Sequence, residues 1–448
     1  MRELFETDGI RGKANIHPMT PEIAMKLGQA LALHFARGDE PPRIVIGKDP
    51  RRSSYIFEFA VAAGACSMGA STFLLGPLPT PAIAFLTAGM RSQAGVVISA
   101  SHNPFSDNGI KVFDGTGFKL PDATEEMIEE LMRDDRRLSQ RPTGARIGRA
   151  YRIEDAAGRY IAFAKDTFPA HLTLRGMKIV VDCANGAAYR VAPAVFEELG
   201  ATVVELGNFP DGTNINRRCG ALHPEYVARV VKREKAHLGI ALDGDADRVI
   251  MVDEKGREVD GDAIMAMIAK FMISQKSLNH GTVVATIMSN MGLEKALEEV
   301  GGRLVRTRVG DRYVLEEMRR GGFNFGGEQS GHMIFLDHTT TGDGIVAALQ
   351  VLTCMLTTGK PLSELAAGME RFPQLAAKVT VQKKIPLDEV PAFQAEIRKV
   401  EKKLGRNGRT VVRYSGTEPV LRIMIEGRDE KLVKELLDHL VAEAKVKI

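Results

Sequence analysis

The stretch Ala94-Gly95-Val96-Val97-Ile98-Ser99-Ala100-Ser101-His102-Asn103-Pro104 decides the fold. Residues 94–98 are apolar and typical of a buried strand, which the small polar residues and the proline then end. A serine just past the carboxyl end of a strand stands where α/β sheets place their chemistry, so Ser101 is the first candidate site residue. The stretch lacks the Gly-x-Ser-x-Gly pattern of an acyl-transfer elbow.

The groups that follow Ser101 suit phosphoryl chemistry. His102 and Asn103 come next, and Lys111 ends the nearby segment Asn108-Gly109-Ile110-Lys111. A hydroxyl, an imidazole, an amide and a lysine in one short segment suit a serine that accepts a phosphoryl group and passes it on. A plain turn is the alternative, because Ser, Asn and Pro are common turn residues. The other polar loops of the chain decide between these two interpretations.

Length, composition and charge limit the number of domains and the kinds of partner to expect. The 448 residues predict about two to four domains. The chain is 44% hydrophobic and 26% charged, which is enough apolar content for several cores. Its 60 basic and 57 acidic residues give a net charge of +3. That balance gives no electrostatic case for nucleic acid or an anionic membrane, so we expect neither as a partner.

The sequence also suggests where the protein works. No apolar run approaches the roughly 18 residues that cross a bilayer, and the first residues carry no apolar signal segment. The four cysteines, Cys66, Cys183, Cys219 and Cys354, are far apart and form no metal-binding pattern. We expect them to stay reduced, and we expect the protein to be cytoplasmic.

Strands alternate with helices in three successive units. The expected strands are 43–47, 71–75 and 94–98, then 178–182, 201–205 and 238–242, then 282–287, 303–307 and 323–325. This alternation predicts mixed or parallel sheets with helices on both faces. The tail has expected strands at 378–381, 410–414 and 421–426, with helices at 390–404 and from 430. The sequence therefore predicts an α/β fold with three similar mixed-sheet βαβ domains, at 1–150, 151–255 and 256–370, and a C-terminal α+β domain at 371–448.

Three carboxylates follow one of the buried strands. Asp243, Asp245 and Asp247 alternate with small residues, so an extended loop turns all three to one side. Such all-oxygen ligands suit Mg²⁺. A calcium EF-hand is the rival, since Glu254 falls at its twelfth position, but Arg248 stands at position six, where that loop needs glycine. Residues 249–252 also continue as a strand, so we expect a magnesium site.

Three further loops carry candidate ligand groups. Glu328 and Ser330 lie among glycines and suit a grip on sugar hydroxyls, although Gly-rich turns are common and His332 has a core histidine as its alternative. The C-terminal loop offers an arginine fork, hydroxyls and exposed backbone N–H groups to a phosphate, through Arg413, Ser415, Gly416 and Thr417, with Arg422 on the next strand. A hairpin with a glycine turn is the alternative there.

Near the start of the chain, two glycines flank Arg11 in Thr7-Asp8-Gly9-Ile10-Arg11-Gly12. They predict a loop that aims the guanidinium group, with an ordinary surface turn as the alternative. Together, the loops supply a phosphoryl acceptor, a magnesium site, a sugar grip and a phosphate anchor. Those are the parts needed to move a phosphoryl group on a phosphosugar.

The chain resembles the α-D-phosphohexomutases along its whole length and, within them, the bacterial phosphoglucosamine mutases. The matching stretches are Thr-Asp-Gly-Ile-Arg-Gly at 7–12, Ser-Ala-Ser-His-Asn-Pro at 99–104, Asn-Gly-Ile-Lys at 108–111, Asp-Gly-Asp-Ala-Asp-Arg at 243–248, Val-Gly-Asp-Arg-Tyr-Val at 309–314, Gly-Glu-Gln-Ser-Gly-His at 327–332 and Arg-Tyr-Ser-Gly-Thr-Glu-Pro at 413–419. The resemblance implies four domains around a central cleft. In chain order these would carry the phosphoserine, the metal, the sugar-recognition loop and a mobile phosphate anchor.

The resemblance also implies roles for individual residues. Ser101 would be a phosphoserine, and one Mg²⁺ per subunit would bind Ser101, Asp243, Asp245 and Asp247. Lys111 looks like the general acid and base, while His102, Arg11 and Arg248 would stabilise the phosphoryl group during transfer. Glu328, Ser330, His332, Arg413, Ser415, Gly416, Thr417 and Arg422 would bind the substrate.

The implied reaction converts glucosamine 6-phosphate to glucosamine 1-phosphate through glucosamine 1,6-bisphosphate, which serves as intermediate and activator. Its product would supply the synthesis of UDP-N-acetylglucosamine, and similar proteins are often homodimers. One alternative is a phosphomannomutase/phosphoglucomutase of the same superfamily. The other is a metal-dependent sugar-phosphate-binding protein without turnover, against which the presence of Ser101, Lys111 and the aspartates argues.

Overall fold

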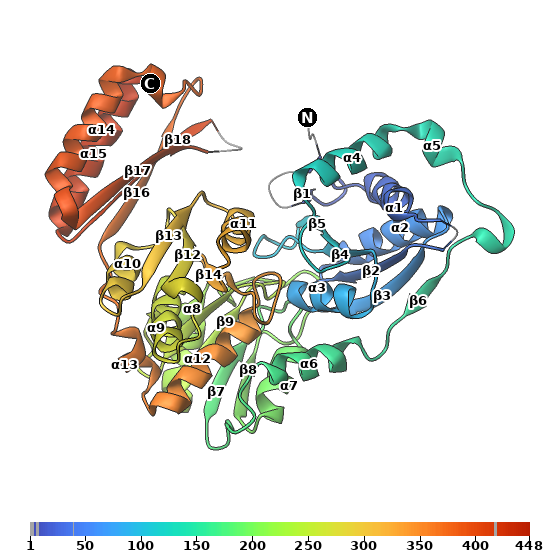
Figure 1. The fold of residues 1–448 in the computed structure, drawn as a ribbon, viewed down its shortest axis with the longest axis horizontal. Helices are drawn as coiled ribbons and strands as arrows, with labels where there is room; N and C mark the ends of the chain where they lie inside the picture. Colours follow the sequence, from blue (N-terminus) through green and yellow to red (C-terminus); the bar gives the residue numbers. More distant parts are fainter. Residues whose placement is uncertain (1–3, 6–8, 39, 416–418) are drawn as a thin grey trace.

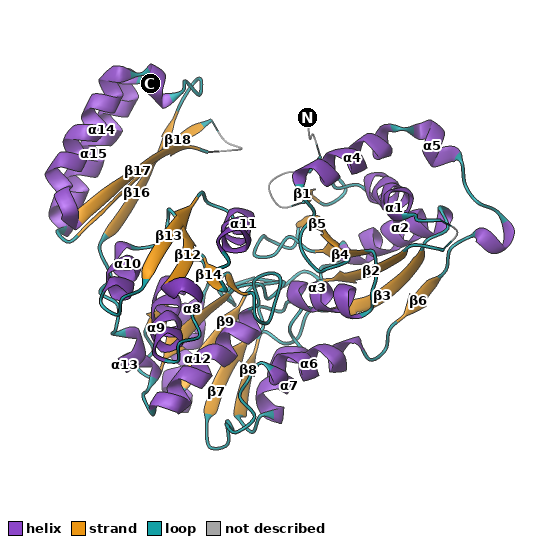
Figure 2. Ribbon diagram, in the orientation of Figure 1, coloured by secondary structure: helices purple, strands orange, loops and turns teal. Residues whose placement is uncertain are grey.

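Four β-sheets follow one another along the chain. The computed structural model describes all residues except 1–3, 6–8, 39 and 416–418. Figure 1 shows the sheets in an arc, with the first and the fourth at its two ends. Helices flank the sheets throughout (Figure 2). The predicted class is confirmed, because the first three sheets are mixed and the fourth belongs to a small α+β unit.

The first sheet has the strand order β1 (Ile10–Lys13), β5 (Asp107–Asp114), β4 (Ala94–Ile98), β2 (Arg43–Lys48), β3 (Ser71–Pro77) and β6 (Ala150–Arg152). Strands β2, β3 and β4 are parallel, whereas β5 and β1 run antiparallel to their neighbours. One face packs on α1 (Pro21–Phe35) and α2 (Ser54–Ser67), with α4 (Asp122–Arg133) and α5 (Asp135–Ser139) beside them, and the other packs on α3 (Thr80–Gly89).

The prediction of a loop around Arg11 was wrong. Arg11 lies in β1, opposite Gly109 of β5, and Lys111 lies farther along β5. A short strand with polar residues and glycine shows no alternation of apolar and polar residues in the sequence. It forms here because a distant strand supplies its hydrogen bonds.

The second sheet has the order β11 (Glu258–Val259), β10 (Val249–Asp253), β9 (Leu238–Leu242), β7 (Lys178–Asp182) and β8 (Thr202–Leu206). Its helices are α6 (Ala156–Asp166), α7 (Val191–Glu198) and α8 (Pro224–Glu234). Helix α8 covers one face, and α7 packs on the other.

The third sheet has the order β13 (Arg303–Thr307), β12 (Thr282–Thr286), β14 (Phe325–Gly327) and β15 (Met333–Phe335). Its helices are α9 (Gly261–Ser274), α10 (Met291–Glu298), α11 (Asp311–Gly321), α12 (Gly344–Thr358) and α13 (Leu362–Ala366). The sequence pattern predicts no helix at α9 or α12. Both are apolar on nearly all sides because they are buried on most faces, so they lack the amphipathic period that marks a surface helix.

The fourth sheet is antiparallel, in the order β16 (Gln374–Thr380), β18 (Val420–Gly427) and β17 (Gly408–Tyr414), with α14 (Pro391–Leu404) and α15 (Glu430–Lys447) on one face. Its core is separate, whereas one continuous apolar core runs through the first three units. Short 3₁₀ turns occupy Gly144–Arg146, Asn279–Gly281, Leu387–Glu389 and Gly405–Asn407. The first three units therefore form one packed body, to which the fourth is attached at its edge.

Two strands lie at the predicted domain boundaries. Strand β6 spans the boundary at 150 and pairs with β3 of the first sheet, while β11 follows the boundary at 255 and pairs with β10 of the second. The four domain ranges stay predictions.

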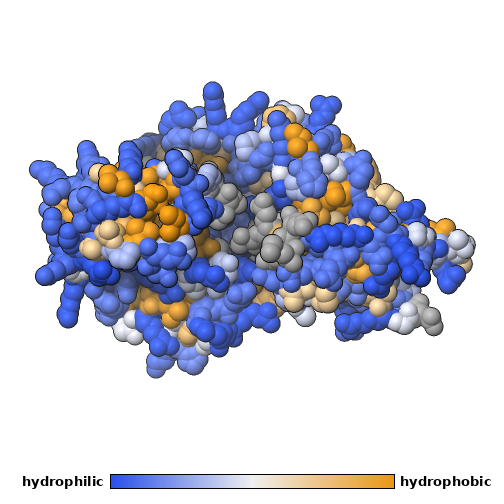
Figure 3. Space-filling model, turned by 90° about the horizontal axis from the view of Figure 1, so that it is seen from above, coloured by the Kyte–Doolittle hydropathy of each residue, from blue (hydrophilic) through white to orange (hydrophobic). Residues whose placement is uncertain are grey.

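The surface and the helices bear on the partner expectations. No helix among the described residues has the length and apolar character needed to cross a membrane. The four cysteines are free thiols. Seen from above, hydrophilic side chains cover most of the visible face, and apolar ones gather in separate patches (Figure 3).

An ion pair attaches the fourth unit to the third. Arg409 donates from Nη1 to the Ile287 carbonyl at 2.8 Å and from Nη2 to the Ser289 carbonyl at 2.6 Å. Its Nε donates to Glu426 at 2.7 Å, and the other Glu426 oxygen accepts the Met291 N–H at 2.6 Å. Glu426 is fully buried, and burial raises the pKa of its carboxyl group. The carboxylate is thus a buried bridge between two separately packed units.

Replacing this bridge should destabilise the protein. Glu426→Ala leaves the Arg409 guanidinium and the Met291 N–H without their shared acceptor, which should lower the free energy of unfolding by about 3 kcal/mol. Urea unfolding measures the change. Glu435→Ala, at an exposed position of α15, is the matched control and should change the free energy of unfolding little. Equal effects of both changes would contradict the bridging role.

Candidate active site

Ser101 is held in an unusual backbone conformation at the end of β4. Its φ is +50°, in the left-handed region that non-glycine residues seldom adopt, and its side chain is buried. The hydroxyl donates to Asp243 Oδ2 at 2.5 Å and lies 3.2 Å from Nδ1 of His102. Backbone strain of this kind persists where the surroundings fix it, which is common at functional sites.

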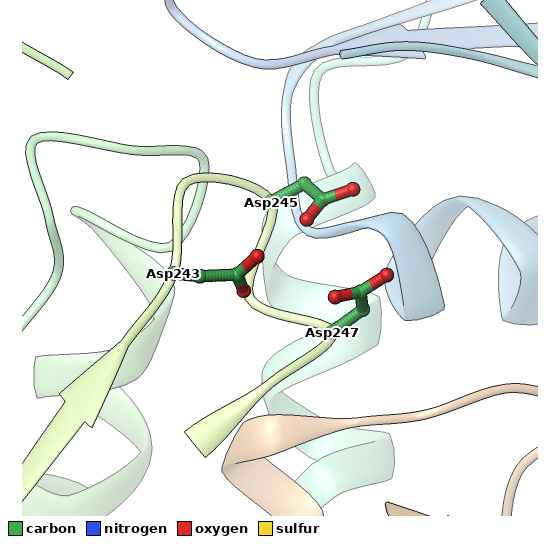
Figure 4. Close-up of side chains that lie close together, drawn as sticks. All are labelled: Asp243, Asp245 and Asp247. Atoms are coloured by element: carbon green, nitrogen blue, oxygen red, sulfur yellow. The ribbon is translucent and has the colours of Figure 1, made fainter. Parts of the chain in front are cut away.

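The three aspartates lie on the loop that joins antiparallel strands β9 and β10. Figure 4 shows the carboxylates of Asp243, Asp245 and Asp247 turned toward one another across this loop. All three are buried, and each offers one oxygen within 4.8 Å of the others. A tight turn at Ala246, with φ of +56°, brings them together. The predicted convergence of the three side chains is confirmed.

This cluster fits a metal ion. Asp245 Oδ1 and Asp247 Oδ1 are buried, and within the described part of the chain neither has a hydrogen-bond partner. Burial and the two neighbouring carboxylates raise the pKa of Asp243 well above its usual range, and this outweighs the opposing effect of Arg248 and the Ser101 hydroxyl. A bound cation relieves that repulsion, so the triad has the donors and the charge to hold a metal.

The EF-hand alternative does not fit the structure. Residues after the loop form strand β10, as expected, rather than a helix. Glu254 is engaged elsewhere, since it accepts hydrogen bonds from the hydroxyl and the N–H group of Ser363. It is therefore not the twelfth ligand of a calcium loop.

Groups from three sheets meet at the aspartates. Lys111 Nζ on β5 lies 3.0 Å from Asp245 and 3.4 Å from Asp247, and the Thr80 hydroxyl at the start of α3 donates to Asp245 at 2.7 Å. From the third unit, His332 Nδ1 lies 3.6 Å from Asp247. Lys111, with its neighbours, holds the pKa of Asp247 well below its usual range against the effect of burial. The aspartate loop is thus the point where the first three units join.

Burial and the basic groups beside Ser101 lower the pKa of His102. Burial lowers the pKa of His102 to about 4, and the nearby guanidinium groups of Arg248 and Arg11 act in the same direction. The Arg248 backbone N–H donates to Asp243 Oδ1 at 3.1 Å, while its side chain lies 3.8 Å from Asp247. The predicted residues Arg11, His102 and Arg248 therefore do lie around the serine, although no motif in the sequence joins them.

Of the sugar-loop candidates, Ser330 lines the same cleft as His102, the neighbour of Ser101. The cleft has a volume of about 430 Å³, and its lining includes His102, Asp243, Arg248, Gln329 and Ser330. The Ser330 hydroxyl lies 3.3 Å from the carboxylate of Glu328, which also accepts the Gly310 N–H at 3.2 Å. His332 does not line the cleft and is buried beside the aspartates. It is therefore a core histidine, as one alternative expected, but one that lies next to the candidate metal site.

Two of the C-terminal candidates, Arg413 and Arg422, line a separate cavity, the basic pocket, whose lining is otherwise mostly apolar. Arg413 and Arg422 are cross-strand partners in the β17–β18 hairpin, and their mutual repulsion adds to burial in lowering the pKa of Arg413. They line a cavity of about 210 Å³ together with Lys378. Ser415 accepts a hydrogen bond from Arg422 at 3.4 Å. The expected ligand groups Gly416 and Thr417 lie outside the described residues.

Several residues of the site were missed in the sequence. Lys384 donates to the Ser415 carbonyl at 2.8 Å, and Lys378 lines the basic pocket. Asp311 lies 3.5 Å from His332 and 2.5 Å from Lys119 of the first unit. Single charged residues on strands or turns give no pattern, so only the fold brings them to the site. The stretch at 309–314 that supported the resemblance did contain Asp311, and it was the available signal.

Comparison with known proteins agrees with this geometry. Sequence models of the phosphoglucomutase/phosphomannomutase family match four successive segments: alpha/beta/alpha domain I at 2–138, domain II at 159–256, domain III at 260–372 and the C-terminal domain at 375–443. A phosphoglucosamine mutase from Anaeromyxobacter sp. (strain Fw109-5) is 59% identical, over 99% of this chain and 95% of its own. The chain belongs to the phosphoglucosamine mutase family. It is thus an enzyme of the isomerase class.

Solved structures share the fold of this phosphoglucosamine mutase family member. A phosphoglucomutase/phosphomannomutase family protein from Burkholderia thailandensis has a TM-score of 0.82 at 23% identity, covering 99% of this chain and 97% of its own. The Aspergillus fumigatus N-acetylphosphoglucosamine mutase, solved with GlcNAc-6P and magnesium, has a TM-score of 0.70 at 18% identity, with 99% and 96% covered. At these identities the likeness concerns the fold alone.

The neutrality of His102 can be measured directly. Because burial and two guanidinium groups lower its pKa to about 4, His102 should stay unprotonated at pH 7 and as far down as about pH 5. A bound cation would act in the same direction. NMR of histidine labelled with ¹⁵N, assigned with a His102→Gln variant, follows the titration. The unfolded chain takes up that proton near pH 6.5, so His102 should contribute to a loss of stability as the pH falls from about 6.5 toward 4. A titration midpoint above pH 6 in the folded protein would contradict this electrostatic picture.

Proposed function

We propose that this enzyme interconverts glucosamine 6-phosphate and glucosamine 1-phosphate through a phosphorylated Ser101 and glucosamine 1,6-bisphosphate. The observation that carries the proposal is the 2.5 Å contact between the Ser101 hydroxyl and Asp243, within the buried aspartate cluster. It leaves the Ser101 hydroxyl beside three buried carboxylates that could hold a metal ion, an arrangement that suits phosphoryl transfer. The amino sugar is proposed from the names of the relatives, since polar groups in the cleft by themselves suit many sugars.

In the first half-reaction, the phosphoryl group on Ser101 passes to O1 of glucosamine 6-phosphate. The bond from Ser101 Oγ to phosphorus breaks, a bond from O1 to phosphorus forms, and the proton of the O1 hydroxyl ends on Oγ. Lys111 is the proposed general acid and base for this proton, since its amine lies at the aspartates. Arg11, His102 and Arg248 are the proposed stabilisers of the phosphoryl group during transfer, by charge and hydrogen bonding.

One Mg²⁺ per subunit is proposed at Asp243, Asp245, Asp247 and the phosphorylated Ser101. Bound there, it would neutralise charge on the phosphoryl oxygens. The buried carboxylate oxygens without hydrogen-bond partners among the described residues support this assignment.

In the second half-reaction, the bisphosphate presents its other end. After it reorients in the cleft, Ser101 Oγ attacks the phosphorus on O6, the bond from that phosphorus to O6 breaks, and the Oγ proton ends on O6. Glucosamine 1-phosphate leaves, and the phosphoserine is restored. The same bisphosphate can also phosphorylate Ser101 of an unmodified enzyme, which makes it an activator as well as an intermediate.

The proposed domains divide this work. Domain 1–150 carries the phosphoserine and domain 151–255 the metal. Domain 256–370 grips the sugar hydroxyls through Glu328 and Ser330, with His332 behind them. Domain 371–448 anchors the phosphate that is not reacting, through Arg413, Ser415, Gly416, Thr417 and Arg422. The separate core of this last unit supports a proposal that it moves between the two half-reactions.

The setting of the reaction is part of the proposal. Glucosamine 1-phosphate would supply UDP-N-acetylglucosamine synthesis. A homodimer and a cytoplasmic location remain predictions from the sequence.

The proposed reaction makes Ser101 indispensable. A coupled assay should give the purified enzyme a higher kcat/KM for glucosamine phosphate than for glucose or mannose phosphate, and peptide mass spectrometry should find phosphate on Ser101. Ser101→Ala should abolish turnover. Ser106→Ala is the matched control, because Ser106 lies in the same loop and bonds only the neighbouring Asp107 among the described side chains.

Each other outcome points to one alternative. A preference for glucose or mannose phosphate would indicate a phosphomannomutase/phosphoglucomutase. Binding without transfer of labelled phosphate from protein to sugar would indicate a sugar-phosphate-binding protein. Normal turnover by Ser101→Ala would exclude the phosphoserine mechanism.

The anchor role of Arg413 predicts a selective loss. Removing a charge-assisted, forked contact should cost about 1.5–3 kcal/mol, so Arg413→Ala should lower kcat/KM roughly ten- to a hundred-fold. Calorimetry should show weaker binding of glucosamine 1,6-bisphosphate and unchanged binding of unphosphorylated glucosamine. Arg406→Ala, at an exposed position of the same unit, is the control. Equal losses for both ligands would assign Arg413 to bracing the hairpin.

A further inference from the structure

Two segments outside the proposed machinery lie against the Ser101 loop. One is the loop at 49–53, between β2 and α2. The other is the long connection at 207–223 in the second unit, between β8 and α8. Neither contributes a residue to the proposed reaction, yet both donate hydrogen bonds to the backbone around Ser101.

Arg51 holds the Ser101 loop from within the first unit. Its guanidinium group is completely buried, which is rare for arginine and requires partners for every N–H group. Nη2 donates to the carbonyls of Ser101 at 2.8 Å and Asn103 at 2.9 Å. Nη1 donates to the carbonyls of Asp107, at 3.2 Å, and Pro104. One side chain thus fixes four carbonyl groups of the loop.

The charge of Arg51 is balanced by a carboxylate that fixes the other side of Ser101. Asp49 accepts from Arg51 Nε at 2.7 Å and from the Ser99 hydroxyl at 2.6 Å. The Ser99 oxygen in turn accepts the Ser101 N–H at 2.9 Å. The N–H and the carbonyl of Ser101 are therefore both bonded, which holds this residue at its positive φ.

Asn216 repeats the Arg51 contacts from the second unit. Its Nδ2 donates to the carbonyls of Ser101 at 2.9 Å and of Asn103 at 3.1 Å. The same two carbonyls thus accept donors from two different units. Asn216 is itself held by its N–H, which donates to the Ala184 carbonyl at 2.9 Å.

The aspartate loop packs directly against the hydrogen bond between Asn216 and the Ser101 carbonyl. A Cβ atom on Gly244 would lie 2.5 Å from the Ser101 carbonyl oxygen and 2.9 Å from Asn216 Nδ2. Only glycine therefore allows the loop between Asp243 and Asp245 to approach Ser101 so closely. The separation of the Ser101 hydroxyl from the aspartates depends on how these backbones meet.

We propose that Asn216 and Arg51 are positioning residues that set the Ser101 hydroxyl in register with the metal-binding aspartates. Arg51 shapes the loop within the first unit, and Asn216 fixes that loop to the unit that carries the aspartates. This inference rests on the proposed function, because it concerns the alignment of the phosphoryl-transfer step. Neither residue lines the cleft proposed to hold the sugar, so the loss should appear in the chemical step rather than in substrate binding.

The test compares two asparagines of one loop. Asn216→Ala should lower kcat about tenfold or more while KM for glucosamine 6-phosphate changes less than about twofold. The Mg²⁺ concentration that gives half-maximal rate should rise, because one ligand oxygen is carried by Ser101. Asn214→Ala is the control, since Asn214 bonds Phe209 and Asp211 within the loop but does not reach Ser101. It should keep the kcat and the Mg²⁺ requirement of the unmodified enzyme.

Thermal unfolding of both variants separates positioning from stability. If Asn216→Ala unfolds at a lower temperature than Asn214→Ala, kcat and KM are measured on Asn216→Asp instead. Aspartate has the size of asparagine but presents carboxylate oxygens, which cannot donate, to the two carbonyl groups. This variant should show the same loss of kcat at unchanged KM. Arg51→Lys, which keeps the charge but loses the fork, should also lower kcat, because one ammonium group cannot reach four carbonyls.

The outcomes distinguish this inference from the proposed function. An unmodified enzyme that transfers no phosphoryl group overturns the proposed function. An active enzyme in which both Asn216 variants keep kcat and the Mg²⁺ requirement overturns the inference alone. Equal losses in Asn216→Ala and Asn214→Ala, or a change confined to KM, also overturn it, since they assign Asn216 to loop stability or to substrate binding.

Discussion

The burial of three carboxylates on one short loop is the constraint on which this structure depends. Buried negative charges are costly unless cations and hydrogen-bond donors compensate them. The compensating groups come from elsewhere in the chain: Lys111 from the first unit and His332 from the third, beside Arg248 on the loop itself. The contacts that compensate the charge of the aspartates therefore hold the first three units together, and the same contacts assemble the candidate active site.

The fourth unit is attached by different interactions. It has its own apolar core and is attached to the third unit through the buried carboxylate of Glu426 and the guanidinium of Arg409. Arg409 and Arg413 lie on one strand, and their cross-strand partners are Glu426 and Arg422. One end of the hairpin thus holds the attachment and the other holds the proposed phosphate anchor. A separate core with a polar attachment suits the proposed movement of this unit between the two half-reactions.

The sequence predicted the parts whose signal is local. The strands with continuous apolar runs, such as β4, β7 and β9, were found, because a strand buried on both faces needs such a run. Other elements carried no such signal. Strand β1 is short, mixes charged residues with a glycine and depends on pairing with β5, and helices α9 and α12 are apolar on nearly all sides. Arg51 and Asn216 could not be assigned either, because their partners are backbone carbonyls that a sequence does not place.

By itself, the sequence determined the chemistry of the site. A serine after a buried strand, three alternating aspartates and a loop with an arginine and hydroxyls can be read directly, because residue type and spacing limit the chemistry that each short loop can supply. Only the tertiary structure decided which of these groups act together. Ser101 and Asp243 are 142 positions apart, yet their side chains share a hydrogen bond. The physical reason is that charge compensation and backbone hydrogen bonding act through space, and these forces select contacts that no spacing along the chain encodes.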